Sequence, residues 1–460
     1  MRRDTVGTGD NQARKGWPRR QLRRLGLVGV FLLAGCGGSE PERENVSNPA
    51  GIASNRAPLS SLLRGVAFAG VAADESRAAE VGRDVLWGGG NATDAAVAMY
   101  FAMAVTLPSA AGLGASGVCV VHDSKTRAGQ AFVFAPVAAP GGIRGVPITV
   151  PSGVRAITLM HTRHGQVRWE AAVAPAERLA RLGVPVSRAL ARDLQVAAGP
   201  LGADSEARRI FGRGTGTAVT EGDNFAQTDL AGTLGIIRQR SGVDMFQGSL
   251  ARVISDQVAQ LGGSLPLETM RNTVPQAGPP AGESYGGFRV YVAPPPMAGA
   301  SALAGWNGQP GPGGAAPTDS GGISGFAAID SKGGAAACSL SMGQLFGARV
   351  MVPGTGILLA TPTPDSTAIS PVVIGNPGNG EVLFAGAGGG SPSAAYATGL
   401  IARGTVTRKQ YVAAALRAHA GQGGYVNAIA CPDGIKSGGV SCNTGVDPAG
   451  TGLALSATPR

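Results

Sequence analysis

The pattern of apolar and polar positions predicts a chain that alternates between helices and strands. Residues 75–86 have helical periodicity and end at the glycine run 88–90, which is a typical helix stop. A second, Ala-rich helix is expected to begin at Asn91, a good N-cap, with Asp94 in its first turn and Pro108 beyond its end. The small side chains of this second helix suit close packing against a sheet.

Short strands are predicted on either side of a polar turn, at 118–122 and 131–134. Further along, a Gly-rich run leads into a hairpin, with strands at 325–329 and 335–341 and a tight turn between them. Composition alone indicates a linker followed by this hairpin. Ser324 is nevertheless the first residue to consider for chemistry, because it places a hydroxyl where the linker becomes sheet.

The composition indicates a folded but loop-rich chain. It has 460 residues, of which 43% are hydrophobic and 15% charged, with 74 Gly and 31 Pro. These proportions allow one large domain or two ordinary ones. The net charge of +10 comes largely from residues 1–35. No basic stripe with interleaved aromatic residues occurs in the rest, and we therefore expect no nucleic-acid partner.

The start of the chain has the organisation of a secretory signal. A basic leader, residues 1–24, precedes the apolar run 25–34, which is too short to span a bilayer as a stable helix. Leu33–Cys36 resembles the lipobox of bacterial lipoproteins, which implies cleavage before Cys36 and a lipid on its sulfur. An ordinary signal with a chance cysteine is the alternative, and Arg19–Arg20 leaves a twin-arginine signal open.

The residues around the five cysteines predict three different roles for them. Cys36 is the expected lipid site. Cys119 and Cys338 lie in apolar strands and are interpreted as buried small hydrophobes. Cys431 and Cys442 lie close together in a Gly-rich tail on the oxidising side of a membrane, which favours a disulfide between them.

No Cys/His spacing indicates a metal site, so neither a metal nor a cofactor is expected. No compact Ser/His/Asp spacing supports a hydrolase site of another kind. The four histidines are scattered and are interpreted as surface or loop residues: His122, His161, His164 and His419.

A series of motifs occurs in one order along the chain. They are GGGNATDAAVAMYFAMAVTLPSAAGLGASGVCVVHD at 88–123, VPSGVRA at 150–156, DLAGTL at 229–234, YGGFRVYVAPPP at 285–296 and PGTGILL at 353–359. In this order they resemble the gamma-glutamyltransferase family over roughly residues 65–405. The resemblance implies an α+β fold, the four-layer αββα sandwich of the N-terminal nucleophile hydrolases. It also implies a precursor that cuts itself into a large and a small subunit, a two-fragment heterodimer.

The expected organisation is a lipoprotein signal (1–35), a polar tether (36–63), a large-subunit-like region (64–304), a Gly/Pro-rich linker (305–323) and a small-subunit-like region (324–460). The first sheet is expected from about 65–300 and the second from about 320–405. We expect the helical middle, 170–265, to form a lobe outside the sheets. The tail 425–460 is expected to be loose apart from its disulfide loop. The lipid would hold the chain on the periplasmic side of the bacterial cell envelope.

The resemblance also locates a nucleophile. The family's TTHxSVVD pattern, counted back from Asp330, puts its first Thr on Ile323 and its second on Ser324. Isoleucine cannot be a nucleophile, but a one-residue shift makes Ser324 the new N-terminus, whose α-amine would act as its own general base. Thr318 and Ser320 are poorer alternatives, further from the strand. A chain with no nucleophile at all stays open.

The same resemblance implies the supporting residues. Gly389 and Gly390 match the glycine pair whose N–H groups form the oxyanion hole, although a plain glycine turn before a helix would look the same. Ser341 stands where the family has a Thr facing the nucleophile. Thr367 keeps one hydroxyl of the family's Ser pair, and Asp365 could receive the amine of a substrate.

Three departures weigh against the usual chemistry. Ala135 stands where the family has the Arg that clamps the substrate carboxylate, and Gly343 replaces an Asn. The linker 306–322 also replaces a longer helical region. Two functions therefore stay open. The first is amide hydrolysis or acyl transfer on a small gamma-glutamyl compound such as glutathione. The second is a catalytically inactive family member that serves as a binding or structural lipoprotein of the envelope.

Overall fold

Two antiparallel β-sheets lie face to face in the computed structural model, which describes residues 68–213, 216–311, 321–420, 423–437 and 439–457. The predicted signal, the tether, Cys36, Thr318 and Ser320 lie outside the described residues. The seven-stranded sheet has the order β17-β1-β9-β10-β2-β3-β6. Its strands are β1 (Gly70–Ala73), β2 (Ser116–Asp123), β3 (Ala128–Phe134), β6 (Gln276–Gly278), β9 (Ile323–Ile329), β10 (Ala335–Ser341) and β17 (Leu453–Ser456).

The six-stranded sheet has the order β16-β15-β14-β13-β8-β7. Its strands are β7 (Ala281–Tyr285), β8 (Phe288–Val292), β13 (Val372–Gly375), β14 (Val382–Gly389), β15 (Tyr425–Ala430) and β16 (Asn443–Val446). Strand β14 packs across β9 and β10 of the other sheet. Small residues bring the sheets close together there, since a Cβ on Gly325 would lie 2.8 Å from the carbonyl carbon of Ala387.

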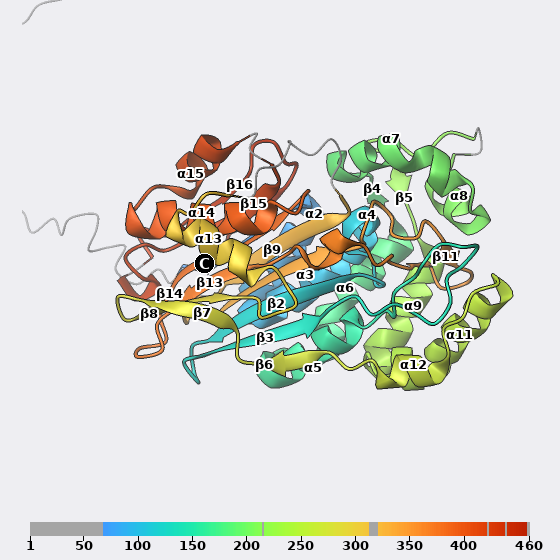
Figure 1. Ribbon diagram of the computed structural model, residues 1–460, viewed down its shortest axis with the longest axis horizontal. Helices are drawn as coiled ribbons and strands as arrows, with labels where there is room; N and C mark the ends of the chain where they lie inside the picture. The colour runs from blue at the N-terminus through green and yellow to red at the C-terminus, as the bar shows by residue number, and fades with distance from the viewer. Residues whose placement is uncertain (1–67, 214–215, 312–320, 421–422, 438, 458–460) are drawn as a thin grey trace, which may run out of the picture. The chain divides into compact units, whose positions relative to one another are not determined.

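Helices cover the outer face of each sheet (Figure 1). The seven-stranded sheet is covered by α2 (Ser76–Trp87) and α3 (Ala92–Thr106), and the six-stranded sheet by α13 (Gly299–Asn307), α14 (Ala394–Thr407) and α15 (Val412–His419). The layers therefore follow the order helix, sheet, sheet, helix. The predicted α+β, four-layer αββα sandwich is confirmed.

The helical middle of the chain extends the α2–α3 side. Helix α6 packs against α3 and α9. The helices of this part are α4 (Pro108–Ala111), α5 (Gly153–His164), α6 (Trp169–Leu182), α7 (Arg188–Gly202), α8 (Ser205–Phe211), α9 (Thr228–Arg240), α10 (Asp244–Gln247), α11 (Ser249–Gln260) and α12 (Leu267–Asn272). Short pairs are formed by β4 (Val184–Pro185) with β5 (Asn224–Phe225) and by β11 (Met351–Val352) with β12 (Ile357–Leu358). None of the helices in the described part of the chain is long and apolar enough to cross a bilayer.

Helix α3 is buried on every side, between the sheet and α6. Its Ala-rich sequence allows this, because small side chains let the sheet and a second helix both approach the backbone. The predicted cap is confirmed. The side chain of Asn91 accepts a hydrogen bond from the N–H of Asp94, and the side chain of Asp94 accepts one from the N–H of Asn91, both at 2.9 Å.

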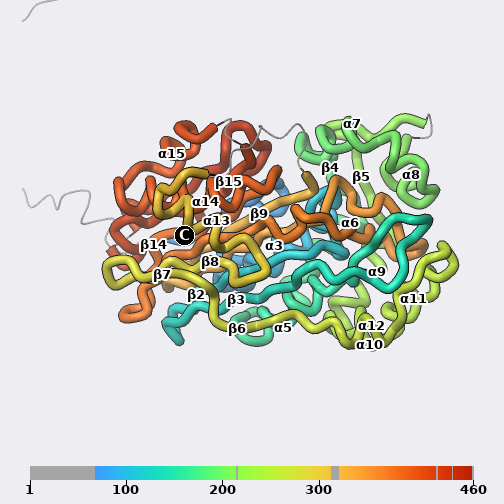
Figure 2. The backbone as a smooth tube through the Cα atoms, in the orientation of Figure 1, coloured from blue at the N-terminus to red at the C-terminus, as the bar shows by residue number. Residues whose placement is uncertain are grey.

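The predicted division into sheets is wrong. Strands β9 and β10 pair with β1 and β2, so the start of the small-subunit-like region completes the first sheet. In Figure 2 the late strand β9 therefore lies with segments from the start of the chain. The tail is not loose either, because β15 and β16 belong to the six-stranded sheet and β17 pairs with β1. Periodicity shows that strands exist, but partners distant in sequence leave no local signal.

The structure corrects two further predictions. Cys119 and Cys338 are buried as expected but form a disulfide, because they occupy directly opposite positions of β2 and β10 with Cα atoms 4.1 Å apart. The predicted Cys431–Cys442 disulfide is confirmed. His122 and His419 are buried rather than at the surface. His122 lies on β2 and stacks on Tyr291 of the other sheet.

Candidate active site

Ser324 is the second residue of β9, which begins two residues earlier than predicted. Its side chain is fully buried, and its Oγ donates a hydrogen bond to the carbonyl oxygen of Ala110 in α4 at 3.2 Å. Phe326 and Ala328 follow on the same face of the strand and pack in the core under α3. The hydroxyl of Ser324 therefore points to the helix side of the sheet.

Ile323 faces the opposite way, since successive side chains of a strand alternate. It packs in an apolar cluster with Val118, Val133, Ala293, Met297 and Ile369. Ala135, which stands where the family has its carboxylate-binding Arg, packs against the same cluster. Two positions that the motif resemblance aligns with polar residues of the family thus contribute to one apolar cluster in this chain.

The structure brings the glycine pair to the Ile323–Ser324 peptide bond. The N–H of Gly390 donates to the carbonyl oxygen of Ile323 at 2.9 Å. Gly390 has φ +81°, a conformation that favours glycine. A Cβ on Gly389 would lie 2.8 Å from Ser324 Cα and 2.9 Å from Ile323 O, so no side chain fits there. Both glycines predicted to bind an oxyanion are therefore adjacent to the bond predicted to break.

A buried carboxyl group that the sequence did not reveal lies beside the same bond. Asp74 Oδ2 accepts the N–H of Gly325 at 2.8 Å, and its Oδ1 accepts Asn427 Nδ2–H at 2.8 Å. Asn427 also donates to the carbonyl oxygen of Gly325 at 3.0 Å. Burial raises the pKa of Asp74 to about 6, although Asn427, Gly325 and the charge of Arg192 each lower it.

The sequence did not single out Asp74, because this residue lies between a short apolar run and a predicted helix. An acidic residue at such a position is typical of a helix N-cap. The cap of α2 is the next residue, Glu75, whose side chain accepts Ala78 N–H. Only the pairing of β1 with β9 brings Asp74 to Gly325. No periodicity within 70–86 could have signalled this contact.

A small cavity adjoins the bond. Asp74, Ala110, Arg192, Ile323 and Tyr425 are among its walls, and its volume of about 10 Å³ is enough for a water molecule but not for a substrate. Arg192 of α7 donates to the hydroxyl of Tyr425 at 3.2 Å. Because Ile323 forms one wall, displacement of this residue would enlarge the cavity.

The other predicted site residues are spread more widely. Ser341 is buried opposite Ile323 in the β9–β10 ladder, and its Oγ accepts the N–H of Gly343 at 3.0 Å. Asp365 and Thr367 lie on a 3-10 turn, Pro364–Thr367, where Asp365 is exposed and the Thr367 hydroxyl donates to Pro364 O. Neither residue lines the small cavity. Within the described residues no cluster of three or more His, Cys, Asp or Glu side chains could hold a metal ion.

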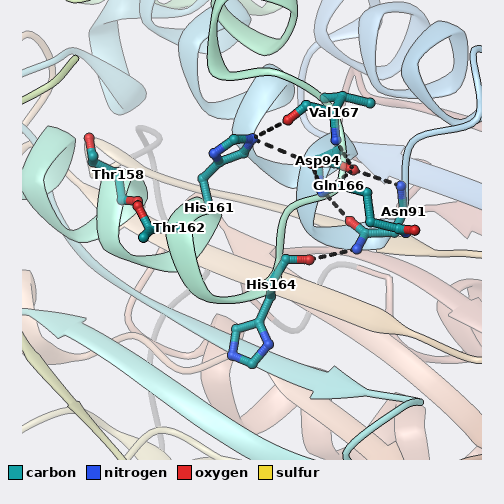
Figure 3. A network of polar contacts seen from close by, with 8 residues as sticks. All are labelled: Asn91, Asp94, Thr158, His161, Thr162, His164, Gln166 and Val167. Atoms are coloured by element: carbon teal, nitrogen blue, oxygen red, sulfur yellow. Dashed lines mark hydrogen bonds and ion pairs between the residues drawn. The ribbon is translucent and has the colours of Figure 1, made fainter.

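A second polar network lies at the N-terminus of α3 (Figure 3). Asp94 accepts the N–H groups of Asn91, Gln166 and Val167 and lies 3.5 Å from His161 Nε2. Asn91 Nδ2 also donates to the carbonyl oxygen of His164 at 2.6 Å. The NATD part of the GGGNATDAAVA motif therefore joins α3 to the end of α5 and the following loop. This role is structural, and the network is separate from the site around Ser324.

The four-layer αββα sandwich is the fold of the N-terminal nucleophile hydrolases. The fold of this chain is similar to that of cephalosporin acylase from Bacillus halodurans, with a TM-score of 0.69, 20% identity, and coverage of 85% of this chain and 96% of that one. A gamma-glutamyltranspeptidase family model matches residues 78–308. The match covers half of the chain, which therefore belongs to the gamma-glutamyltranspeptidase family.

Curated relatives resemble the same half of the chain. The glutathione hydrolase proenzyme of Bacillus subtilis (strain 168) is 31% identical over 249 residues, and that of Escherichia coli (strain K12) is 30% identical over 246 residues. Each alignment covers 50% of this chain and 42% of the relative. The chain thus matches less than half of the length of these relatives. The part of the chain that the family model matches ends at residue 308, before Ser324.

Proposed function

We propose that the chain is a self-cleaving amide hydrolase or acyl transferase that acts on gamma-glutamyl compounds such as glutathione, with Ser324 as its nucleophile. The observation that carries the proposal is the hydrogen bond from Gly390 N–H to Ile323 O. A donor is already in place at the oxygen on which negative charge would develop if Ser324 attacked this bond. Lipidation at Cys36 on the periplasmic side of the envelope is part of the same proposal.

Cleavage would proceed as an acyl shift followed by hydrolysis. Ser324 Oγ attacks the carbonyl carbon of Ile323, a C–O bond forms, and the carbonyl oxygen becomes an oxyanion facing Gly390. The C–N bond then breaks while the proton from Oγ goes to the nitrogen of Ser324, which leaves an ester. Water hydrolyses the ester to an Ile323 carboxylate and a Ser324 with a free hydroxyl and a free α-amine.

The freed Ser324 would then attack the amide carbonyl of a substrate, with its α-amine as general base. An amine leaves, and water or a second amine takes the acyl group. Because Ser324 faces α4, the substrate would enter from the side of α4 and α7 once Ile323 has moved away. The loss of the family's Arg at Ala135 predicts weak affinity for a gamma-glutamyl carboxylate.

A second candidate function is that of an uncleaved, catalytically inactive binding or structural protein of the envelope. The apolar cluster around Ile323, with Ala135 against it, favours this alternative. A cluster of this kind stabilises the fold and offers no group to a polar substrate. The cavity beside Ile323, which is no larger than a water molecule, supports it as well.

Electrophoresis separates the two candidates. The Cys119–Cys338 disulfide joins the regions on either side of residue 323, so cleavage is visible only after reduction. We expect two fragments from the wild type under reducing conditions and hydrolysis of a gamma-glutamyl anilide by the folded protein. Ser324→Ala should give one chain and no hydrolysis.

A matched control for this variant is Ser339→Ala. Ser339 is buried on the neighbouring strand, and its hydroxyl has no hydrogen-bond partner among the described residues. This variant should cleave and hydrolyse like the wild type. A wild type that stays intact after reduction and leaves the anilide untouched would support the inactive candidate instead.

A further inference from the structure

Asp74 and Asn427 together hold both polar groups of the Gly325 backbone. Asp74 Oδ2 accepts its N–H at 2.8 Å, and Asn427 Nδ2 donates to its carbonyl oxygen at 3.0 Å. The backbone N–H of Asp74 donates to the same carbonyl oxygen at 3.2 Å. Gly325 is the residue after Ser324, and the bond predicted to break is the one before Ser324. The clamp that Asp74 and Asn427 form on Gly325 therefore fixes the position of Ser324.

The clamp also lies against the oxyanion glycines. A Cβ on Gly389 would be 2.3 Å from Asp74 Oδ2, 2.8 Å from Ser324 Cα and 2.9 Å from Ile323 O. These three atoms therefore surround one small space at Gly389. The side chain of Asp74 therefore lies next to the Ile323–Ser324 bond and to the glycine that packs against it.

We propose that Asp74 is the positioning residue for self-cleavage at Ile323–Ser324, and that the clamp is complete only when Asp74 is a carboxylate. This inference rests on the proposed function. Both oxygens of Asp74 accept hydrogen bonds, one from Gly325 N–H and one from Asn427 Nδ2–H. Protonation places a hydrogen on one of these two oxygens, which makes that oxygen a poorer acceptor and weakens its bond to Gly325 N–H or to Asn427 Nδ2–H.

Several groups surround Asp74 and contribute to its titration. Asn427 and Gly325 donate to it, Arg192 of α7 favours its charged form, and Asp193 opposes it. Tyr425 of β15 lies on the same cavity. Burial is the dominant influence and raises the pKa of Asp74 to about 6. Cleavage should therefore be slow below this pH and should accelerate as the pH rises through it.

The test measures the cleavage rate against pH. The full chain is purified unfolded in urea and diluted into buffers of different pH with a cysteine–cystine redox pair, and fragments are counted on reducing gels. We expect the wild-type rate to rise about ten-fold or more across the range from roughly pH 5 to 7.5. Asp74→Asn keeps the size of the side chain but mimics the protonated clamp, so it should cleave slowly at every pH.

A second variant makes the pH dependence diagnostic. Asn427→Leu removes a hydrogen bond that lowers the pKa of Asp74, and the midpoint of the rate profile should move to higher pH. Circular dichroism of each refolded variant checks that the fold is kept. If the cleavage rate depends on pH in the same way in the wild type and in Asp74→Asn, the proposed role of Asp74 is wrong, but the proposed function is not affected. An intact wild type at every pH would overturn this role together with the proposed function.

Discussion

Ile323 and Ser324 are consecutive in β9, yet their side chains face opposite layers of the sandwich. Ile323 packs between the sheets with Met297 and Ile369, whereas Ser324 Oγ contacts the carbonyl oxygen of Ala110 in α4. A one-residue shift of a nucleophile along a strand therefore reverses the face from which a substrate must approach. The hydroxyl of Ser324 therefore lies on the opposite face of the sheet from the apolar cluster that contains Ile323 and contacts Ala135.

Gly389 gives a direct test of the space around the bond. Gly389→Ala would place a methyl group against Asp74, Ser324 and Ile323, all within 2.9 Å. We expect self-cleavage to slow by about ten-fold or more, since the bond and its oxyanion donors can no longer keep their geometry. The rate of fragment formation on reducing gels measures this.

Gly232→Ala is the matched control for this substitution. Gly232 lies inside α9, and an added Cβ there has no heavy atom within 4 Å. Alanine at an open helical position stabilises by roughly 1 kcal/mol, so cleavage should proceed at the wild-type rate. Equal cleavage by both variants would show that the space at Gly389 does not affect self-cleavage.

Asp74 makes a pH-dependent contribution to stability. Its pKa is raised from 3.8 to about 6 in the folded protein, so the folded state binds the proton more tightly. The resulting stabilisation is complete below about pH 3.8 and is lost as the pH rises through about 6, a change of about 3 kcal/mol. At pH 7.5 the buried carboxylate therefore destabilises the fold.

Asp74→Asn should remove this dependence. In a Ser324→Ala background, which keeps the chain whole, urea unfolding at pH 4 and pH 7.5 measures the two free energies of unfolding. We expect Asp74→Asn to be more stable than its parent at pH 7.5 by about 1–3 kcal/mol and to show a smaller difference between the two pH values. An unchanged difference would show that Asp74 is not protonated preferentially in the folded state.

The two disulfides should behave differently after cleavage. Replacement of both Cys119 and Cys338 by alanine should let the fragments separate without reductant and should lower the free energy of unfolding by about 2–5 kcal/mol. The corresponding double variant of Cys431 and Cys442 is the control, because both of its cysteines lie in one fragment. Non-reducing gels and urea unfolding provide the measurements. Separation of the fragments in the control would contradict the Cys119–Cys338 pairing.

Asp94 should affect the fold and not the chemistry. Asp94→Ala removes the buried acceptor that the partly buried N–H groups of Asn91, Gln166 and Val167 share. We expect a loss of about 1–3 kcal/mol in the free energy of unfolding, because three partly buried donors lose their shared acceptor. The proportion of cleaved chain among folded molecules should not change. A folded variant that no longer cleaves would connect this network to the site.

Local sequence chemistry predicted much of the fold. The hairpin strand 335–341, the cap at Asn91 and the Cys431–Cys442 bridge all depend on residues near one another in the chain. The motif order, from GGGNATDAAVA to PGTGILL, indicated the four-layer sandwich before any strand pairing was known. These features need no knowledge of distant partners.

The features that sequence reasoning missed all depend on distant pairings. Cys119 meets Cys338 only because β2 pairs with β10. Asp74 meets Gly325 only because β1 pairs with β9. The same pairings decide that Ser324 faces α4, which a motif aligned residue by residue cannot show. The roles of Ser341, Asp365 and Thr367 remain predictions.

The N-terminal sequence of the smaller fragment tests self-cleavage at Ser324 most directly. The full chain, residues 1–460, is produced in a bacterial host, reduced, and separated by size. A small fragment that begins Ser324-Gly325-Phe326, present in the wild type and in Ser339→Ala but absent in Ser324→Ala, is the expected result. A single intact chain in the reduced wild type, or a fragment that begins at another residue, would contradict it.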